Sequence, residues 1–530
     1  MSVLLQDVSD PTLVVSGLAP SVHPVTAPLW IAGQNVVFED LSVRKSPGYS
    51  AVCTTTGTNP VTGAVTVDSS GNLSVLWGDI NTLYAFNNSV GFSTEGTGYS
   101  GTINRDAYQD NTFQGATTGG YEDAFQLDSS PQLSVWDMVA YGNWGVATNG
   151  INNVQYDKFD GNGAQALTTE VAFALCIVLF ADQLLAFNTD LDNMGFEWSD
   201  IDNIVGNAAW IPTDTNAAGN LSVRDMGGPI IAAEHLGAYV GAYSKDALAL
   251  VTSLGAPLYF GAQVVLRGIG ACSRHSVVPV GYYNYGISEK GIWQTDGQSY
   301  NYISPPFLRK WIKDNVNFGF EDNIAGFYNE DRSLIEWGVP TFTGGGSGQN
   351  DTTIGFNVDN GSWTFKNYGI TAGVQKGVFQ FPIFGLPNGT MMFGEIGVDA
   401  NGSAFPSYVQ TKPFACITPK PDRNTMNYYK PSINLEWKIV ESFYAHLQAL
   451  AGTGVQVQIG VQPDLLTSIT WSAPITPDGS SNPFFPTDGG SPPNELQGKY
   501  ISFKISSSAI GDNWQLAGLQ IFGSFNGTEI

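Results

Sequence analysis

Residues 282–297 read YYNYGISEKGIWQTDG, and this stretch decides the fold class. Two short apolar runs, 282–288 and 292–297, lie on either side of Glu289-Lys290-Gly291, which is the pattern of an antiparallel hairpin. Similar pairs recur along the chain at a spacing of roughly 40–60 residues. The clearest of them are LSVLWGD (73–79) with TLYAFN (82–87), WDMVAYG (136–142) with WGVATNG (144–150), and IVLFAD (177–182) with LLAFN (184–188). The sequence therefore predicts an all-β protein.

The size of the recurring unit favours one architecture. A sheet of two to four short strands cannot bury both of its faces, whereas sheets repeated around an axis bury them against one another. We therefore expect residues 28–410 to form a β-propeller with insertions. The units share no G-H…W-D signature, so an ordinary WD40 propeller is not expected.

The two ends of the chain have a different character. Residues 1–27 have mixed polarity, several prolines and no sustained period, and we expect an extended N-terminal arm there. Toward the other end, the runs VQVQIGV (455–461), KYISFKI (499–505) and NWQLAGLQIFG (513–523) read as half-buried strands. They predict a C-terminal antiparallel, β-sandwich-like domain over residues 411–530.

One segment has the period of a helix. In PPFLRKWIKDNV (305–316), Pro306 suits the first turn, and Leu308, Trp311 and Ile312 share one face. We expect this face to pack on a sheet. A weaker helical candidate is SDIDNIVG (199–206).

Composition limits the possible partners. Only 13% of the residues are charged, 62 are glycine, and the net charge is −25. A protein that grips nucleic acid needs a basic surface, which this chain lacks, although an acidic wall could let DNA slide past without sticking. Acidity that only keeps the protein soluble explains the charge equally well. The N-terminus lacks the features of a signal peptide, and no apolar run reaches the length of a membrane span.

Residues with catalytic or metal-binding potential are scattered, and we predict no catalytic, cofactor-binding or metal-binding site. The four histidines and the four cysteines form no metal-ligand motif, and the cysteines suit a reducing cytosol. The acidic pairs and the segment DKFDGNG (157–163) are typical of turns, and the tryptophans within strands are typical of a core. The histidines, cysteines and acidic pairs are His23, His235, His275, His446, Cys53, Cys176, Cys272, Cys416, Asp190/Asp192, Asp200/Asp202 and Glu330/Asp331.

Several segments, in order, resemble one family. WIAGQNVVFEDLSVRKSPGY (30–49) is similar to the opening strands "N-x-x-F-x-D-G-x-x-x-K-R-x-G" of tail proteins from short-tailed bacteriophages, with Leu41 where glycine is usual. Further similar segments are WDMVAYGNWGVATNGINNVQYDKFDG (136–161), FEWSDIDNIVGNAAW (196–210), DMGGPIIAAEHLGAYVGAYSKDALALV (225–251), GIGACSRHSVVPVGYYNYGISEKGIWQTDG (268–297) and DNWQLAGLQIFGSFNG (512–527). The resemblance covers residues 28–340 and the last strand, and residues 341–500 diverge from it.

The resemblance implies a structural, non-enzymatic virion protein: the nozzle or hub of a short tail. It implies a homo-oligomeric ring, a hexamer in that family, through which DNA is ejected without specific binding. It also implies docking of tail adaptor or tube proteins and of tail fibre or spike proteins, and assembly in the cytoplasm of the host bacterium. The alternative is a phage-associated propeller that binds or cleaves glycans, as a receptor-binding protein or a depolymerase.

Overall fold

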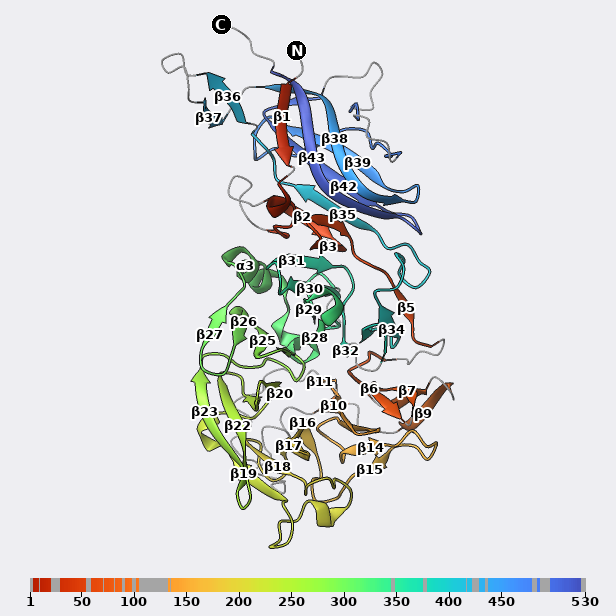
Figure 1. The fold of residues 1–530 in the computed structure, drawn as a ribbon, viewed down its shortest axis with the longest axis vertical. Coiled ribbons are helices and arrows are strands. Elements are labelled where there is room, and N and C mark those ends of the chain that lie inside the picture. The colour runs from red at the N-terminus through yellow and green to blue at the C-terminus, as the bar shows by residue number, and fades with distance from the viewer. Residues whose placement is uncertain are drawn as a thin grey trace, which may run out of the picture. The chain divides into compact units, whose positions relative to one another are not determined.

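The computed structural model describes most of the chain as short antiparallel strands (Figure 1). The all-β prediction is therefore confirmed. The described residues are 3–8, 10–20, 29–53, 59–69, 71–80, 82–87, 91–97, 102–103, 132–133, 135–344, 348–374, 379–415, 417–421, 429–433, 437–478, 484–486 and 496–525.

Seven four-stranded sheets lie within these described ranges, and six of them are formed by four strands that follow one another in the sequence. These six are β6 (Gly63–Ser69), β7 (Asn72–Gly78), β8 (Thr82–Asn87) and β9 (Gly91–Thr97); β12 (Asp137–Tyr141), β13 (Trp144–Thr148), β14 (Gln155–Asp157) and β15 (Gln165–Ala166); β16 (Ala174–Phe180), β17 (Gln183–Thr189), β18 (Gly195–Trp198) and β19 (Gly219–Ser222); β20 (Ala232–Leu236), β21 (Tyr239–Tyr243), β22 (Ala247–Gly255) and β23 (Tyr259–Arg267); β24 (Val277–Val280), β25 (Tyr283–Ser288), β26 (Gly291–Thr295) and β27 (Tyr300–Tyr302); and β28 (Ala325–Asn329), β29 (Leu334–Val339), β30 (Thr352–Asn357) and β31 (Trp363–Lys366).

The seventh sheet joins distant parts of the chain. Its order is β32 (Ala372–Val374), β33 (Ile383–Gly385), β34 (Met391–Gly394) and β5 (Tyr49–Ala51). Next to β5, the Val52 N–H donates to the carbonyl oxygen of Met391 at 2.9 Å. An early strand thus completes a sheet whose other three strands come more than 300 residues later.

The first strands of the seven sheets contact one another in a cyclic order. β6 contacts β12, and the sequence of contacts continues through β16, β20, β24, β28 and β32, which contacts β6 again. Between neighbouring sheets lie apolar cores that contain large aromatic side chains, such as Trp198 and Trp293. The cyclic order agrees with the propeller interpretation of these small sheets.

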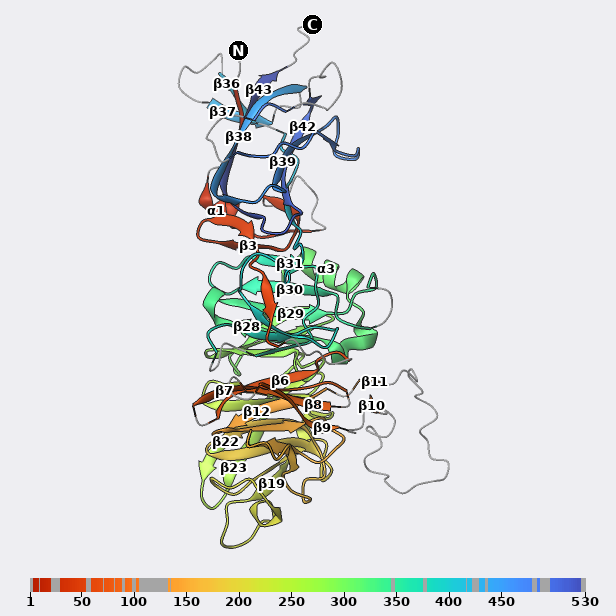
Figure 2. The ribbon, with the colours of Figure 1, turned by 90° about the vertical axis from the view of Figure 1, so that its right-hand side faces the viewer.

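Two further sheets pack against each other elsewhere in the chain (Figure 2). The rings of Phe443 and Phe503 lie 6.0 Å apart between them, and the Trp514 indole N–H donates to Ser407 Oγ at 2.9 Å. One sheet contains β1 (Val3–Val8), β3 (Val36–Glu39), β4 (Ser42–Lys45), β43 (Asn513–Phe525), β38 (Lys438–Ala451) and β41 (Gln497–Gly498), and the other contains β2 (Trp30–Gln34), β35 (Ser407–Thr411), β42 (Tyr500–Ser507), β39 (Gln456–Gln462) and β40 (Thr470–Trp471).

The contacts divide the chain into two compact units whose limits differ from the expected ones. The small unit comprises 1–50, 354–367 and 395–530, and the large unit comprises 51–353 and 368–394. Residues 1–27 are not an isolated arm, because β1 pairs with β43 along its length. The predicted boundaries at 28 and 411 missed this because pairing between the chain ends leaves no local pattern.

Smaller elements complete the description. The helix α3 (Pro306–Asn315) confirms the prediction for 305–316, and its Leu308 and Ile312 are fully buried. The helix suggested for 199–206 is wrong, because a bridge between Asp200 and Asn203 forms a turn there. Other elements are α1 (Pro11–Val14), four short 3-10 segments within the described residues, and the pairs β10 (Thr102–Ile103) with β11 (Gln132–Leu133) and β36 (Ile417–Pro421) with β37 (Tyr429–Ile433).

Candidate functional site

Charged side chains meet at the centre of the large unit, where the first strands begin. Arg274 and His275 precede β24, yet they contact the start of the sheet of β12, which is three sheets away in the cyclic order. Arg274 Nη1 donates to the carbonyl oxygen of Val135, and Nη2 donates to that of Asn149 at 3.0 Å. His275 Nε2 lies 2.7 Å from the carbonyl oxygen of Trp136. The segment before β24 therefore reaches across the centre.

Two carboxyl groups belong to the same central cluster. Asp137 begins β12, and its Oδ2 accepts a hydrogen bond from the Ile177 N–H at 2.8 Å. Burial raises the pKa of Asp137, while the nearby His275 and the Ile177 N–H act in the opposite direction. Burial also raises the pKa of Glu234, on β20, well above its ordinary value, and the charge of Asp137 adds to this rise.

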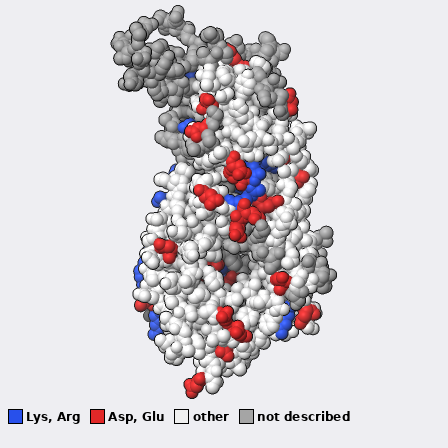
Figure 3. Space-filling view, viewed as in Figure 1, with Lys and Arg blue, Asp and Glu red and all other residues white. Residues whose placement is uncertain are grey.

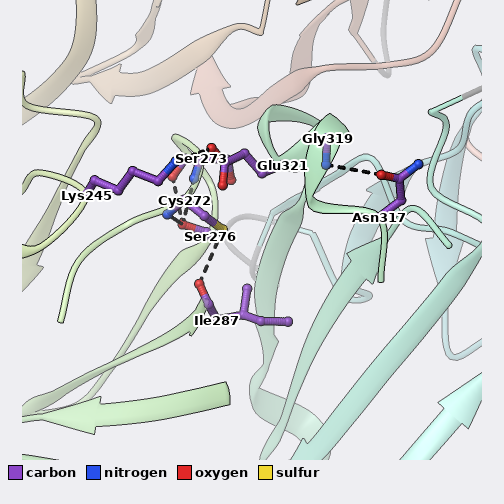
Figure 4. Close-up of polar contacts among 8 residues, drawn as sticks. All are labelled: Lys245, Cys272, Ser273, Ser276, Ile287, Asn317, Gly319 and Glu321. Carbon is purple, nitrogen blue, oxygen red and sulfur yellow. Dashed lines mark hydrogen bonds and ion pairs between the residues drawn. The ribbon is translucent and has the colours of Figure 1, made fainter. Parts of the chain in front are cut away.

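The loop that carries Arg274 and His275 is held by its own hydrogen bonds (Figure 4). Ser276 Oγ accepts from the N–H groups of Cys272 and Ser273 at 3.2 and 3.1 Å. Cys272 Sγ donates to the carbonyl oxygen of Ile287, and burial raises the pKa of this thiol to about 12. These bonds fix the backbone on both sides of the two central side chains.

An ion pair near this loop joins Lys245, which follows β21, to Glu321, which precedes β28. Lys245 Nζ lies 2.8 Å from Glu321 Oε1, and Figure 4 places the pair beside Cys272. Glu321 belongs to a short 3-10 segment (Phe318–Asn323), which begins where Asn317 Oδ1 accepts from the Gly319 N–H at 3.1 Å. The arrangement is structural, since each polar group named here has a partner within the protein.

A pocket lies beside His275 in the large unit. The space between atoms there, open solvent included, is about 360 Å³. Its wall is formed near the starts of β6, β28 and β32 by polar and apolar residues, and most of its accessible surface is apolar. The lining residues are Pro60, Thr62, Val135, His275, Asp322, Asn323, Ile324, Ala325, Gln349, Asn350 and Thr371.

The chemistry available at the centre is limited. A glycosidase needs one protonated carboxyl group and one ionised carboxylate, whereas burial raises the pKa of both Asp137 and Glu234. Asp137 is also held by a backbone N–H, and Arg274 spans the space beside it. Among the residues that the structure describes, no three His, Cys, Asp or Glu side chains converge as metal ligands.

The residues weighed from the sequence lie mostly in turns and cores, as expected. Asp192 and Asp200 accept hydrogen bonds from backbone N–H groups two residues and one residue away, as turn residues do, whereas Asp190 accepts from the N–H of Ala172, 18 residues earlier. In 157–163, Asp160 accepts from the Asn162 N–H, and this bond lowers the pKa of its carboxyl group. His23 and Cys416 lie outside the described residues, while Cys53 is half-buried and Cys176 and Cys272 are buried. The strand tryptophans are buried at Trp77, Trp198, Trp293, Trp337 and Trp363.

Sequence reasoning considered His275 singly and missed Asp137, Glu234 and Arg274. A usable signal existed, because only 13% of the residues are charged and these three lie within or directly before short, otherwise apolar strands. A charged residue in such a strand needs a partner in the interior. Which distant residue supplies that partner depends on the order of the sheets.

Comparisons with known proteins add little. No helix in the described ranges has the length and apolarity to cross a membrane. No protein-family model matches the sequence, and no curated protein matches it. One solved structure that it resembles is the crystal structure of the computationally designed Ika8 protein, which is 10% identical, with a TM-score of 0.34, over 66% of this chain and 100% of that chain. A likeness of this size carries no argument about fold or function.

Proposed function

We propose that this chain is a structural subunit of a bacteriophage short tail, in the nozzle or hub, and that it has no catalytic role. The proposal rests first on the ordered segments that resemble that family. It also rests on the seven small sheets, whose first strands all lie in the large unit and contact one another in a cyclic order, and on the completion of the sheet of β32–β34 by β5 from the N-terminal side. Such a unit can serve as a rigid wall element.

The observation that carries the mechanism is the position of Arg274. Its guanidinium group bonds the carbonyl oxygens of Val135 and Asn149 across the centre of the large unit. A duplex therefore has no route through the middle of one subunit. If the protein conducts DNA, the channel must lie between several copies arranged around a common axis.

The surface charge supports passage without binding. Figure 3 shows a face that is mostly uncharged, on which acidic side chains are spread more widely than Lys and Arg. The net charge of −25 repels phosphates, so a duplex would slide along such a wall. Adaptor or tube proteins and fibre or spike proteins would dock on the outer surfaces of the ring.

The proposal is tested by the mass and symmetry of the purified assembly. We expect electron microscopy and light scattering to find a closed ring of copies, six by family resemblance, with an axial opening wide enough for a duplex. Purified virions should contain the same ring at the tail. A protein that stays monomeric at high concentration and is absent from virions would contradict the proposal.

A second candidate, a propeller that cleaves glycans, is favoured by the two carboxyl groups of Asp137 and Glu234. It predicts that the protein releases reducing ends from a bacterial capsule polysaccharide and that Glu234→Gln abolishes the release. The matched control is Asp190→Asn, in a turn where the carboxylate accepts the Ala172 N–H. We expect the unmodified protein to release no reducing ends. If it does release them, and Glu234→Gln abolishes the release while Asp190→Asn does not, the glycan-cleaving function replaces the structural proposal.

A further inference from the structure

The outer edge of one sheet in the large unit is long and open. β23 is the last strand of the sheet β20-β21-β22-β23, and within the described part of the chain it pairs only with β22. Figure 1 shows β23 on the outer side of that sheet. β23 has nine residues, whereas β9 has seven and the outer strands β5, β15, β19, β27 and β31 have two to four. A long edge strand presents backbone N–H and C=O groups that can pair with another chain.

This edge lacks most of the features that keep natural edge strands apart. Short length, charged side chains and proline are the usual protection. Residues 247–266, which cover β22 and all of β23 except its last residue, contain no charged side chain, and Pro257 lies in the turn between the strands. A bulge at Val265 interrupts the register, but the five residues 260–264 pair with β22 without interruption. These five residues therefore form a regular, uncharged edge.

Apolar side chains beside this edge are exposed to solvent. Leu254, at the end of β22, is 54% exposed, and Leu258, in the turn, is 67% exposed. On β23 itself, Val265 is 37% exposed and Gln263 is also exposed. Apolar groups that gather at one place on a surface mark a contact, whereas single scattered ones do not.

The chemistry of the edge identifies what can cover it. Outward N–H and C=O groups of a strand are satisfied by another extended strand. That strand should be uncharged, because residues 247–266 offer no charge with which an acidic or basic strand would pair. A basic partner would instead favour the acidic surface of this chain, whose net charge is −25.

A second copy of the chain supplies such a strand. Two copies that each carry a charge of −25 repel each other least where neither presents a charged side chain, and β23 is such a place. Two identical strands can pair antiparallel about a twofold axis, so that the outward N–H groups of one meet the outward C=O groups of the other. The charge of the chain and the backbone of the edge thus indicate the same partner.

We propose that β23 pairs with β23 of a second copy, antiparallel and centred on Ala262, the middle of the regular stretch 260–264. The two four-stranded sheets then form one continuous sheet of eight strands. This contact uses the same surface on both copies and closes at two, whereas a ring is built from contacts between different surfaces. The inference therefore goes beyond the proposed function and does not depend on it.

The first experiment measures the mass of the full-length protein against concentration, by sedimentation velocity and light scattering. Val265→Lys places a positive charge on the edge of each copy. The matched control is Leu191→Lys, because Leu191 is 61% exposed and follows β17, outside 247–266. We expect the parent and Leu191→Lys to double in mass as the concentration rises, and Val265→Lys to self-associate at least about tenfold more weakly.

A second pair of variants separates added charge from lost apolar surface. Gln263→Lys and Gln263→Glu remove no apolar side chain, and each alone should weaken the association as Val265→Lys does. A mixture of the two should associate again, because position 263 of one copy lies diagonally across the twofold axis from position 263 of the other. A variant with a damaged fold would not recover on mixing.

Hydrogen exchange locates the contact. In the associated parent, backbone amides of β23 should exchange at least about tenfold more slowly than in Val265→Lys, because the pairing protects their outward N–H groups. The amides of α3, which lies in the next sheet along the chain, should exchange equally in both proteins.

The inference is overturned if the parent does not pair at any concentration, which would leave the edge for an extended strand of a different protein. It is also overturned if Val265→Lys and Gln263→Lys pair as the parent does, or if mixing the two Gln263 variants restores nothing. A ring whose mass is unchanged in both edge variants contradicts this pairing alone, whereas pairs without a ring contradict the proposed function alone.

Discussion

The two units build their sheets in opposite ways. In the large unit, strands that neighbour each other in a sheet usually follow one another in the chain, as β12 to β15 do. In the small unit, the sheet order β3-β4-β43-β38-β41 brings together strands from both ends of the chain. Local pairing leaves a pattern that can be read from the sequence, whereas pairing over hundreds of residues leaves none.

The difference also implies separate cooperative cores. The largest expected effects come from two tryptophans that are both fully buried, Trp337 in the large unit and Trp514 in the small unit. Replacing either with alanine removes a large side chain and leaves a cavity, at a cost of about 3–5 kcal/mol. We expect each substitution to shift the unfolding transition of its own unit to lower denaturant concentration. Denaturant titration measures this shift, and limited proteolysis identifies the unit that has unfolded.

The control for this pair is Tyr282→Ala, in the large unit, where the side chain is 80% exposed and little should change. If Trp337→Ala and Trp514→Ala shift one common transition by the same amount, the two units unfold together and the comparison fails.

The next effect concerns the N-terminal segment. Leu5 is 2% exposed and belongs to β1, the strand that pairs with β43. Leu5→Ala should destabilise the small unit by about 2–4 kcal/mol, as for other buried leucines. Leu4→Ala, at a side chain that is 44% exposed, is the matched control. Equal and small effects in both variants would mean that residues 1–27 act as a free arm after all.

The same contrast explains what could be predicted. The hairpin of β25 and β26 follows from two apolar runs separated by three turn residues, and α3 follows from the spacing of Leu308 and Ile312. The pairing of β1 with β43 could not be predicted, because Val8 meets Leu519 across more than 500 residues. The central cluster was missed for the same reason, since Arg274 finds its partners three sheets away.

The pH dependence of stability should also separate the units. Burial raises the pKa values of Glu234 and Asp137 in the large unit. The folded unit therefore keeps protons that the unfolded chain has lost. This contribution to stability is complete below the ordinary values of 4.5 and 3.8 and is lost as the pH rises through the raised values. Glu234→Gln should flatten that decline in unfolding measured from acidic to neutral pH.

Two other groups, Asp296 and Lys45, have lowered pKa values and should make stability rise with pH. Backbone N–H groups lower the pKa of Asp296, so its contribution is present above the ordinary value of 3.8 and is lost as the pH falls. Burial lowers the pKa of Lys45 in the small unit, so the stability of that unit should rise with pH between the lowered value and 10.5. Asp296→Asn should therefore change the dependence of the unfolding free energy on acidic pH in the opposite direction to Glu234→Gln. Identical pH profiles for the two variants would contradict the directions of these two pKa shifts.

The smallest effect tests whether local turns contribute equally in the two units. β3 and β4 are joined by Asp40-Leu41, and β16 and β17 by Ala181-Asp182; in both turns both residues have positive φ, between 49° and 62°. A residue with a Cβ is disfavoured there and glycine is not. Leu41→Gly and Asp182→Gly should each stabilise their own unit by about 0.5–1 kcal/mol.

Leu41 makes this test specific, because it occupies the position where the resembling family has glycine, at a φ of 57° and with 61% of its side chain exposed. Leu41→Ala keeps the Cβ and is the control, for which no gain is expected. If Leu41→Gly leaves the stability of the small unit unchanged while Asp182→Gly stabilises the large unit, a contact of the leucine side chain offsets the unfavourable positive φ of its backbone. That result would point to a contact made in the assembled protein, since nothing within the small unit covers most of this side chain.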